Sequence, residues 1–322
     1  MSTAAATAPR PAADPRRADR RPRRSVHPLG GALGRHPVGW AFIAPYVVFL
    51  AAIFAYPLGY AIWMSFHDAF FTAPGVSVPQ PFVGLGNYRE VLGDPQVRRA
   101  FLNIAEFPVI NVPLTALLSL VLATALNSKI PARGFFRGAY YVPYITASVA
   151  VVTVWLFIFS GNGLANRLLG PLAPHPSWLV NTGWAMPMIA LYVTWKQLGF
   201  FILLYLAALQ GVPKERYESA AVDGATRLQQ FTNVTIPSVR SATSLVVVLA
   251  IITGGNLFTE PYLLTSGGGP INSSTSPVLI IYQRGIEQGR PGFASALGVL
   301  LVVFVLAVSL LSRRVVDRGS DS

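Results

Sequence analysis

Apolar residues along the chain fall into long, nearly continuous blocks, without the alternation of a strand or the period of an amphipathic helix. A bilayer core takes about 20 apolar residues per helix, and several blocks reach that length. The blocks therefore predict an all-α membrane protein with six transmembrane helices. The predicted spans cover residues 39–66, 101–126, 138–160, 183–209, 239–264 and 293–312.

Prolines interrupt several of these blocks, and they would argue against helices in a soluble protein. They include Pro45, Pro57, Pro108, Pro113 and Pro187. Membrane helices tolerate proline because neighbouring helices and polar side chains can satisfy the freed carbonyl groups. The prolines are therefore compatible with the predicted spans.

The residues before the first block differ from the rest of the chain. Residues 1–37 are rich in Ala, Pro and Arg, and too little apolar surface is present to offset the entropy of ordering. A secretory signal peptide is the competing interpretation, but the charged stretch is too long and a full span follows it. We expect a disordered cytoplasmic tail over 1–37, a transmembrane domain over 38–314 and a short cytoplasmic tail over 315–322.

Composition supports a membrane protein, because 52% of the residues are hydrophobic and only 12% are charged. The net charge of +12 could indicate nucleic-acid binding. However, the basic residues gather in the N-terminal tail and beside the apolar blocks, as topology signals do, so we expect no nucleic acid partner. Cysteine is absent and the four histidines are dispersed, so we expect no disulfide and no metal site.

The distribution of lysine and arginine predicts the orientation of the chain. If the N-terminus is cytoplasmic, the inner segments hold eighteen of these residues and the outer loops hold six. Cytoplasmic loops carry the excess of positive charge in membrane proteins. We therefore expect a multi-pass protein of the cell inner membrane with both termini in the cytoplasm.

The long inner loop over 211–237 predicts a helix, a tight reversal and a second helix. Pro213 suits a first helical position, and Glu215 and Glu218 lie in the opening turns, where the helix dipole favours negative charge. Gly224 permits the reversal because glycine adopts left-handed conformations easily.

One face of the first predicted helix carries small residues. Tyr217, Ala220, Ala221 and Gly224 recur at helical spacing, which would let the helix lie close against a partner. An amphipathic helix resting on the membrane surface fits the spacing equally well. The pattern alone leaves both interpretations open.

The same stretch closely resembles the cytoplasmic coupling motif of ABC importer permeases, usually written Glu-Ala-Ala, three residues, Gly, nine residues and Ile-x-Leu-Pro. Ser219 replaces the first alanine, and Val234 stands for the isoleucine. The resemblance implies a cytoplasmic coupling helix pair between transmembrane helices four and five. It implies ATPase-coupling roles for Tyr217, Glu218, Ala220, Ala221, Asp223, Gly224, Ala225, Phe231 and Pro237.

Other stretches resemble the carbohydrate-uptake branch of that family, which includes the maltose and glycerol-phosphate permeases. They are residues 82–88, 133–137 and 264–270, with Trp195 and Gly199. The resemblance implies alternating-access transport of an oligosaccharide, disaccharide or polyol across the inner membrane. It also implies as partners a second homologous permease, an ATP-binding cassette ATPase dimer, an extracytoplasmic solute-binding protein and the lipid bilayer.

The chain lacks the sequence features of a nucleotide site or an enzyme. A phosphate-binding loop needs Gly-Lys-Ser/Thr, whereas Lys129, Lys196 and Lys214 follow Ser, Trp and Pro. Paired carboxylates and nucleophile–base sets are also missing. We therefore expect a transport subunit without catalytic residues or cofactors, with ATP bound and hydrolysed by a separate subunit.

Polar residues inside the predicted spans are costly and are candidates for function. For Glu106 and Lys196 we favour a position near a membrane interface, reached by snorkelling in the case of the lysine. Asn256 and Glu260 are four residues apart on one face of span 239–264, which lines the pathway in the resembled family. For them, substrate contact and structural hydrogen bonding both remain open. The candidate pathway residues are Asn111, Trp195, Gln197, Asn256, Glu260 and Tyr262.

Position alone suggests a further set of contacts. Asn87, Tyr88 and Arg98 in the first outer loop are candidates for contact with the binding protein.

Two other functions remain as alternatives. The first is an importer permease for a non-sugar solute such as a polyamine or phosphate. The second is an ion-coupled secondary transporter, a class that often shows inverted repeats, although no clear repeat is present.

Overall fold

The computed structural model describes residues 37–71, 78–128 and 131–318. Regular structure in these residues is helical, apart from an isolated β-bridge between His67 and Phe82. The predicted all-α class is therefore confirmed. The N-terminal tail predicted over 1–37 lies outside the described residues, except for Pro37.

The chain divides into two compact units, residues 1–56 and 57–322. In the first unit, α1 (Pro37–Leu50) continues into a short π-helical turn, η2 (Ala51–Ala55). The side chains from Phe42 onward are exposed in this unit, although they are mostly apolar. An exposed apolar helix of this kind suits contact with lipid or with another hydrophobic helix.

The second unit holds the remaining helices. In chain order they are α2 (Tyr56–Ser65), α3 (Gly86–Gly93), α4 (Pro95–Asn127), α5 (Arg133–Ile145), α6 (Ser148–Phe159), α7 (Leu164–Leu169), η3 (Gly170–Leu172), η4 (Trp178–Val180), α8 (Ala185–Gln210), α9 (Lys214–Val222), α10 (Arg227–Gln230), η5 (Phe231–Thr235), α11 (Ile236–Ser238), α12 (Arg240–Gly255), α13 (Thr259–Leu263), η6 (Pro270–Asn272), α14 (Pro277–Tyr282), η7 (Gln283–Glu287) and α15 (Pro291–Arg318).

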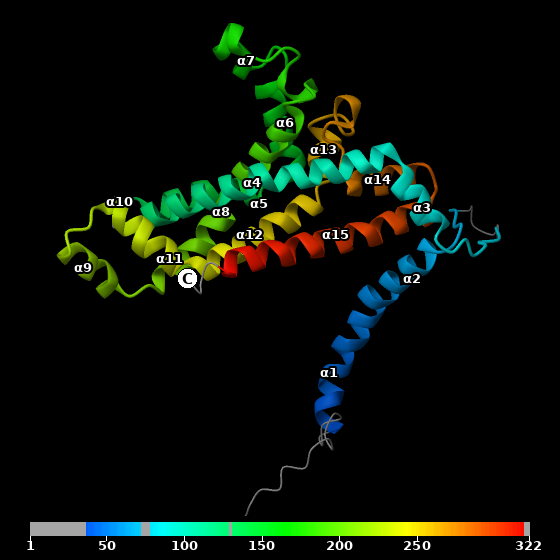
Figure 1. The fold of residues 1–322 in the computed structure, drawn as a ribbon, viewed down its shortest axis with the longest axis horizontal. Helices are drawn as coiled ribbons and strands as arrows, with labels where there is room; N and C mark the ends of the chain where they lie inside the picture. The colour runs from blue at the N-terminus through cyan, green and yellow to red at the C-terminus, as the bar shows by residue number, and fades with distance from the viewer. Residues whose placement is uncertain (1–36, 72–77, 129–130, 319–322) are drawn as a thin grey trace, which may run out of the picture. The chain divides into compact units, whose positions relative to one another are not determined.

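Long helices packed side by side form the core of the second unit. Helix α4 packs against α8 and α12, and α12 packs against α15. Figure 1 shows α4, α12 and α15 running alongside one another, with α9 and α10 at one end and α3 and α14 at the other. The arrangement separates the 211–237 loop from the first outer-loop stretch by the length of the bundle.

Helix α8 is the most enclosed of the long helices, and its buried side chains include Tyr192 and Tyr205. Gly199 lies where α5 crosses α8. A Cβ atom at Gly199 would stand 2.2 Å from the carbonyl oxygen of Tyr140, so only glycine allows this approach. The Gly199 seen in the sequence resemblance therefore has a packing reason.

Among the described residues, five helical segments are long and apolar enough to cross a membrane, and a bent pair raises the number to six if it counts as one span. The five are Phe42–Ser65, Pro95–Asn127, Ser148–Leu172, Ala185–Gln210 and Pro291–Ser312. The pair joins Arg227–Ser238 to Arg240–Gly255 at an angle of 72°. These segments agree with the predicted spans in number and order, with two differences in extent.

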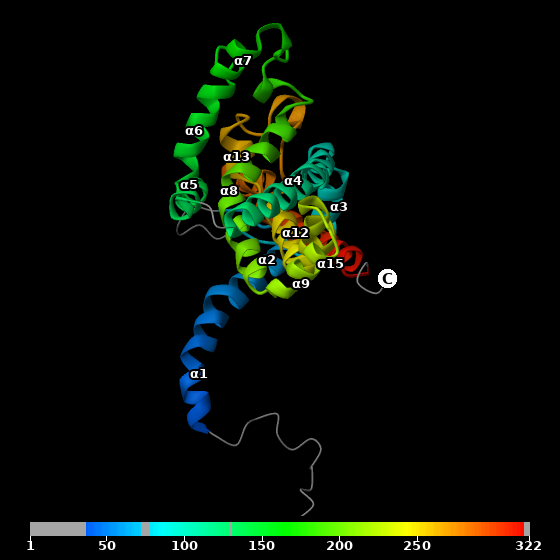
Figure 2. The ribbon, with the colours of Figure 1, turned by 90° about the vertical axis from the view of Figure 1, so that its left-hand side faces the viewer.

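The third predicted span, 138–160, is interrupted. Helix α5 ends at Ile145, the backbone of Thr146 and Ala147 is extended, and α6 begins at Ser148. Pro143 weakens the end of α5, and the Thr146 hydroxyl donates to the carbonyl of Val142. Figure 2 shows α5, α6 and α7 as successive pieces of the green part of the ribbon.

The fifth predicted span, 239–264, ends early at Gly255. Asn256 and Phe258 have non-helical backbone angles, and the separate helix α13 starts at Thr259. Two consecutive glycines lower the helix propensity at this point, which explains the break. The prediction that Asn256 and Glu260 share one face of a continuous helix is therefore wrong.

Candidate functional site

The 211–237 loop folds as a helix, a reversal and a second helix, as its sequence predicts. Helix α9 ends at Val222, Gly224 has a φ of +77°, and α10 begins at Arg227. No atom lies within 4 Å of the position of a Cβ on Gly224. Glycine is therefore favoured at this position by its backbone conformation and not by crowding.

Hydrogen bonds hold the reversal in place. Thr226 and Gln229 form a capping box, in which the Gln229 N–H donates to Thr226 Oγ1 at 3.3 Å and the Thr226 N–H donates to Gln229 Oε1 at 2.8 Å. The Ala225 N–H donates to the Ala220 carbonyl at 2.9 Å. These bonds satisfy donors at the start of α10 and fix its direction relative to α9.

Only part of the small-residue face that the sequence predicts on α9 is exposed. Tyr217 and Ala220 are half-buried, whereas Ala221 and Gly224 are exposed. The Tyr217 hydroxyl is 3.1 Å from Thr235 Oγ1, so this side of α9 lies against η5. Half of the predicted face therefore holds the helix pair together and is not free for a partner.

The opposite side of α9 forms a shallow acidic hollow. Its lining residues are Glu215, Glu218, Ser219, Val222 and Asp223. The Val222 side chain is 89% exposed at its edge. Three carboxylates around an exposed apolar residue form what we call the acidic tip. Sequence reasoning did not single out Val222, which follows two alanines and gives no local sign of its exposure.

The acidic tip is linked to the bend before α12. Pro237 lies in the short helix α11, and Val239 has non-helical angles where the 72° bend occurs. Pro237 therefore opens α11, and the next long helix begins only at Arg240. A hydrogen bond of 3.2 Å from Arg216 to Ser238 joins α9 to this bend.

Two of the candidate pathway residues form hydrogen bonds that connect neighbouring helices. Asn111 is buried, and its Nδ2 donates to Thr194 Oγ1 at 2.8 Å, which joins α4 to α8. Gln197 Oε1 accepts a hydrogen bond of 3.4 Å from Thr253 Oγ1, which joins α8 to α12. The Asn111 side chain is buried between α4 and α8 and is not exposed to a solute, whereas the Gln197 side chain is only half-buried.

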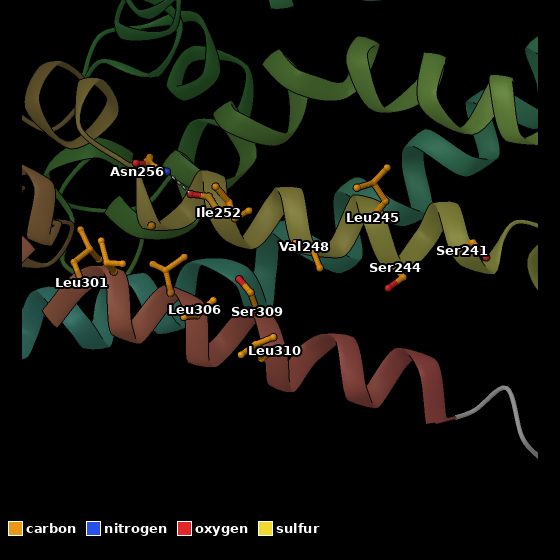
Figure 3. A pocket seen from close by; sticks show the side chains of 13 residues that line it. Ser241, Ser244, Leu245, Val248, Ile252, Asn256, Leu301, Leu306, Ser309 and Leu310 are labelled. Atoms are coloured by element: carbon orange, nitrogen blue, oxygen red, sulfur yellow. Dashed lines mark hydrogen bonds between the residues drawn. The ribbon is translucent and has the colours of Figure 1, made fainter. Parts of the chain in front are cut away.

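Asn256 lies in a groove between α12 and α15, with its Nδ2 donating to the Ile252 carbonyl at 2.8 Å. The groove has a volume of about 660 Å³ and is mostly apolar, with serines toward its other end (Figure 3). Its lining includes Ser241, Ser244, Leu245, Val248, Ile252, Asn256, Leu301, Leu306, Ser309 and Leu310.

The remaining candidates lie around α8 and α13. The Trp195 side chain is 40% exposed and its ring centroid is 5.8 Å from that of Trp155. Tyr262 stacks on Phe258 at 5.5 Å. Glu260 is half-buried in the first turn of α13.

Lys196 and Glu106 were both expected near a membrane interface. Lys196 Nζ donates to Ser148 Oγ, and the position of the lysine near a membrane interface stays a prediction. Glu106 is exposed on α4.

The first outer-loop stretch has a structural role. Asn87 is buried, and its Nδ2 donates to the carbonyls of Ser65 at 3.0 Å and His67 at 2.9 Å. The Tyr88 hydroxyl is 2.7 Å from Ser65 Oγ. Asn87 is therefore not available to a binding protein as we had expected, whereas Arg98 is exposed.

Two ion pairs that sequence reasoning missed lie near the start of α15. Arg290 contacts both oxygens of Glu90, at 2.8 and 2.7 Å, and Arg284 lies 3.2 Å from Asp94. The hydrogen bonds from Arg290 hold the pKa of the Glu90 carboxyl below its ordinary value. The pairs join the α3–α4 region to α15, although the partners are separated by roughly two hundred positions in the sequence.

The chain is similar in sequence to a known family of membrane transport components. Residues 115–320 match the family described as binding-protein-dependent transport system inner membrane component. The chain is 33% identical to the arabinooligosaccharides transport system permease protein AraP of Bacillus subtilis strain 168, over 89% of this chain and 94% of that protein. It is 32% identical to the lactose transport system permease protein LacF of Rhizobium radiobacter, over 85% and 91%.

A solved structure shares the fold. It is the crystal structure of a bacterial ABC transporter involved in the import of the acidic polysaccharide alginate. The TM-score is 0.72 at 23% identity, with 87% of this chain and 95% of that chain covered. The family match spans more than half of the chain, and its members are transport components, not enzymes. The chain is an ABC importer permease subunit of the binding-protein-dependent inner membrane family.

Proposed function

We propose that this subunit translocates a sugar, either an oligosaccharide, a disaccharide or a polyol, across the inner membrane by alternating access. The names of the two relatives, which refer to arabinooligosaccharides and lactose, support a carbohydrate. The chain belongs to a binding-protein-dependent transport family, which favours the importer over the ion-coupled secondary transporter. A non-sugar solute such as phosphate or a polyamine remains the alternative that a competition assay would reveal.

The observation that carries the ATP-driven part of the proposal is the acidic tip on the α9–α10 reversal. Its carboxylates surround an exposed valine, and the Arg216–Ser238 bond links α9 to the bend before α12. Such a surface fits a basic groove on a partner subunit. We assign the predicted coupling residues to this docking, with Glu218, Val222 and Asp223 in contact and Tyr217 positioning α9.

The assembly in this proposal follows the sequence-based expectation. A second homologous permease completes the pathway, two ATPase subunits dock on the coupling loops, and a solute-binding protein delivers the sugar from outside. Both termini are cytoplasmic, which places the acidic tip on the ATPase side. ATP is held by the ATPase subunits, and this chain needs no cofactor of its own.

Charge reversal of Glu218 tests the docking. Glu218→Lys should leave membrane insertion intact, because the residue is exposed on α9. It should lower the amount of ATPase that copurifies and reduce sugar uptake about tenfold or more, as expected when a charged contact worth about 2–5 kcal/mol is reversed.

The matched control is Glu287→Lys, which makes the same change on the exposed η7 segment at the other end of the bundle. This variant should copurify with the ATPase and transport as the parent does. Normal copurification and uptake with Glu218→Lys would contradict the docking assignment.

A further inference from the structure

A cluster of buried polar side chains lies where α4 contacts the segment between α13 and α14. Asn103 of α4 is fully buried, and its Nδ2 donates to the carbonyls of Asn272 and Thr275, each at 2.9 Å. Ser273 and Thr275 belong to that segment and are 3% and 0% exposed. The Asn103 amide therefore lies directly against the backbone that carries these two hydroxyl groups.

Three oxygen atoms of this cluster have no hydrogen-bond partner among the described residues. They are Asn103 Oδ1, Ser273 Oγ and Thr275 Oγ1, which we call the unpaired oxygens. Burial of a polar atom without a hydrogen bond is costly, so such atoms in native proteins are nearly always satisfied by a protein group or by ordered water. Because the three atoms belong to groups in contact, one shared partner could satisfy them all.

The neighbouring hydroxyl groups are bonded within the protein. Ser274 Oγ donates to Thr265 Oγ1 at 2.7 Å. Ser276 Oγ donates to the Leu257 carbonyl and accepts from the Leu279 N–H at 3.1 Å. The segment as a whole is therefore not short of partners, and the shortage is confined to the unpaired oxygens.

A turn of glycines fixes the positions of the two unpaired hydroxyl groups. Gly268 and Gly269 have φ of +112° and +73°. A Cβ on Gly268 would stand 3.0 Å from Thr275 Oγ1, and a Cβ on Gly269 would stand 3.0 Å from Ser273 Oγ. Both hydroxyl groups therefore lie against two consecutive residues of the same turn, which keeps them close to each other and to Asn103.

The chemistry of the unpaired oxygens fits a water molecule better than an ion. An amide oxygen only accepts hydrogen bonds, whereas a hydroxyl group donates and accepts. Water can donate to the amide oxygen and to one hydroxyl group while it accepts from the other. A divalent cation calls for carboxylates, which none of the three side chains carries. A monovalent cation would leave the protons of both hydroxyl groups without an acceptor.

We propose that one buried water molecule binds in this cluster and bridges Asn103 on α4 to Ser273 and Thr275. Buried waters typically make about three hydrogen bonds to polar groups that would otherwise be unsatisfied, and three such atoms are present here. The water adds to the two bonds of the Asn103 amide and so completes the connection between α4 and the segment that leads into α14. This site does not depend on the proposed sugar or on the ATPase.

Thr275→Val tests for the water by the sign of its effect on stability. The substitution removes Oγ1 and nearly keeps the shape of the side chain. If a water binds Oγ1, the substitution leaves one bond of that water unmade, and the thermal midpoint of the purified transporter should fall by about 2–4 °C. If Oγ1 is dry, its removal relieves a buried unsatisfied atom, and the midpoint should rise. A rise or an unchanged midpoint would overturn the proposal.

A double-mutant cycle tests whether both hydroxyl groups bind the same water. No direct hydrogen bond joins Ser273 Oγ to Thr275 Oγ1. Ser273→Ala should also lower the midpoint, and it carries the sign test if Thr275→Val fails to insert. The double variant should lose about half the sum of the two single losses, because the first substitution already releases the water. The control pair, Thr275→Val with Thr232→Val in η5, should be additive, and additive losses in the first pair would contradict a shared water.

A high-resolution map of the assembled transporter gives the direct observation. One peak should lie about 2.5–3.2 Å from all three unpaired oxygens in the parent and should be absent in Thr275→Val. Replacement of Na⁺ and K⁺ by choline should leave this peak and the midpoint of the parent unchanged. A parent map without the peak would overturn the proposal. A peak or midpoint lost in choline would overturn it in favour of a bound cation.

Discussion

At the scale of single residues, Gly224 and Val222 contribute different properties to the same reversal. Gly224 supplies the left-handed backbone, with a φ of +77° that side chains with a Cβ rarely adopt. Val222 supplies exposed apolar surface, at 89% exposure, within a ring of carboxylates. The left-handed backbone at Gly224 fixes the direction of the reversal, and the exposed position of Val222 depends on that direction.

Gly224→Val tests the conformational requirement. A β-branched residue at positive φ is strained by about 1–3 kcal/mol, so the reversal should open and the acidic tip should lose its geometry. We expect normal insertion, reduced ATPase copurification and uptake reduced about tenfold. Gly138→Val is the matched control, since Gly138 is helical and also has open space around its Cβ position. Equal losses in both variants would show that the effect is not specific to the reversal.

At the scale of elements, breaks in long helices position the polar groups. The bend between α11 and α12 joins the 211–237 loop to the bundle, and the break after Gly255 separates α12 from α13. Helix α5 crosses α8 at Gly199, where backbone approaches backbone. These three features place α9, α8 and α13 in fixed relation to the packed core.

Gly199→Ala tests the crossing. The added Cβ would lie 2.2 Å from the Tyr140 carbonyl oxygen, so α5 must shift away from α8. Overpacking of this kind destabilises by about 1–3 kcal/mol, and the thermal midpoint in detergent should fall. Gly138→Ala, on the open side of α5, should instead stabilise by about 0.5–1 kcal/mol. A thermal midpoint that Gly199→Ala leaves unchanged would show that the crossing is not tight.

The sequence allowed the helical class and the order of the spans to be predicted, because hydrophobic blocks report burial in lipid directly. It also predicted the reversal at Gly224, since only local backbone preference is involved. The break at 256–258 was missed, because an apolar block conceals a change of helix direction. The pairing of Arg290 with Glu90 and the contact of Lys196 with Ser148 depend on tertiary packing between distant segments, which no local pattern reports.

At the scale of the whole molecule, the packed bundle separates two kinds of surface. Helix α9, which carries the acidic tip, lies at one end of the second unit, and α3, which carries Glu90 of the Arg290–Glu90 pair, lies at the other (Figure 1). Between these ends, Lys196 lies near the middle of α8, where its Nζ donates to Ser148 Oγ. In the proposed function, the ATPase contacts the end that carries the acidic tip, and the solute enters from the opposite end.

Single-cysteine labelling tests the orientation. Ser219→Cys and Gln288→Cys each place a thiol on an exposed position in a chain without other cysteines. In intact cells an impermeant thiol reagent should label position 288 and spare position 219, because we place the acidic tip in the cytoplasm. Permeabilised cells are the control, in which both positions should react. Labelling of position 219 from outside would reverse the proposed orientation and remove the coupling role.

The most direct test of sugar import driven by ATP is uptake into proteoliposomes that contain the complete transporter. The probe is the sugar that copurifies with the partner solute-binding protein, supplied outside together with that protein. We expect accumulation that requires ATP at the ATPase side, persists with an ionophore present and is abolished by Glu218→Lys. Accumulation driven by an ion gradient without ATP, or unaffected by Glu218→Lys, would contradict this account.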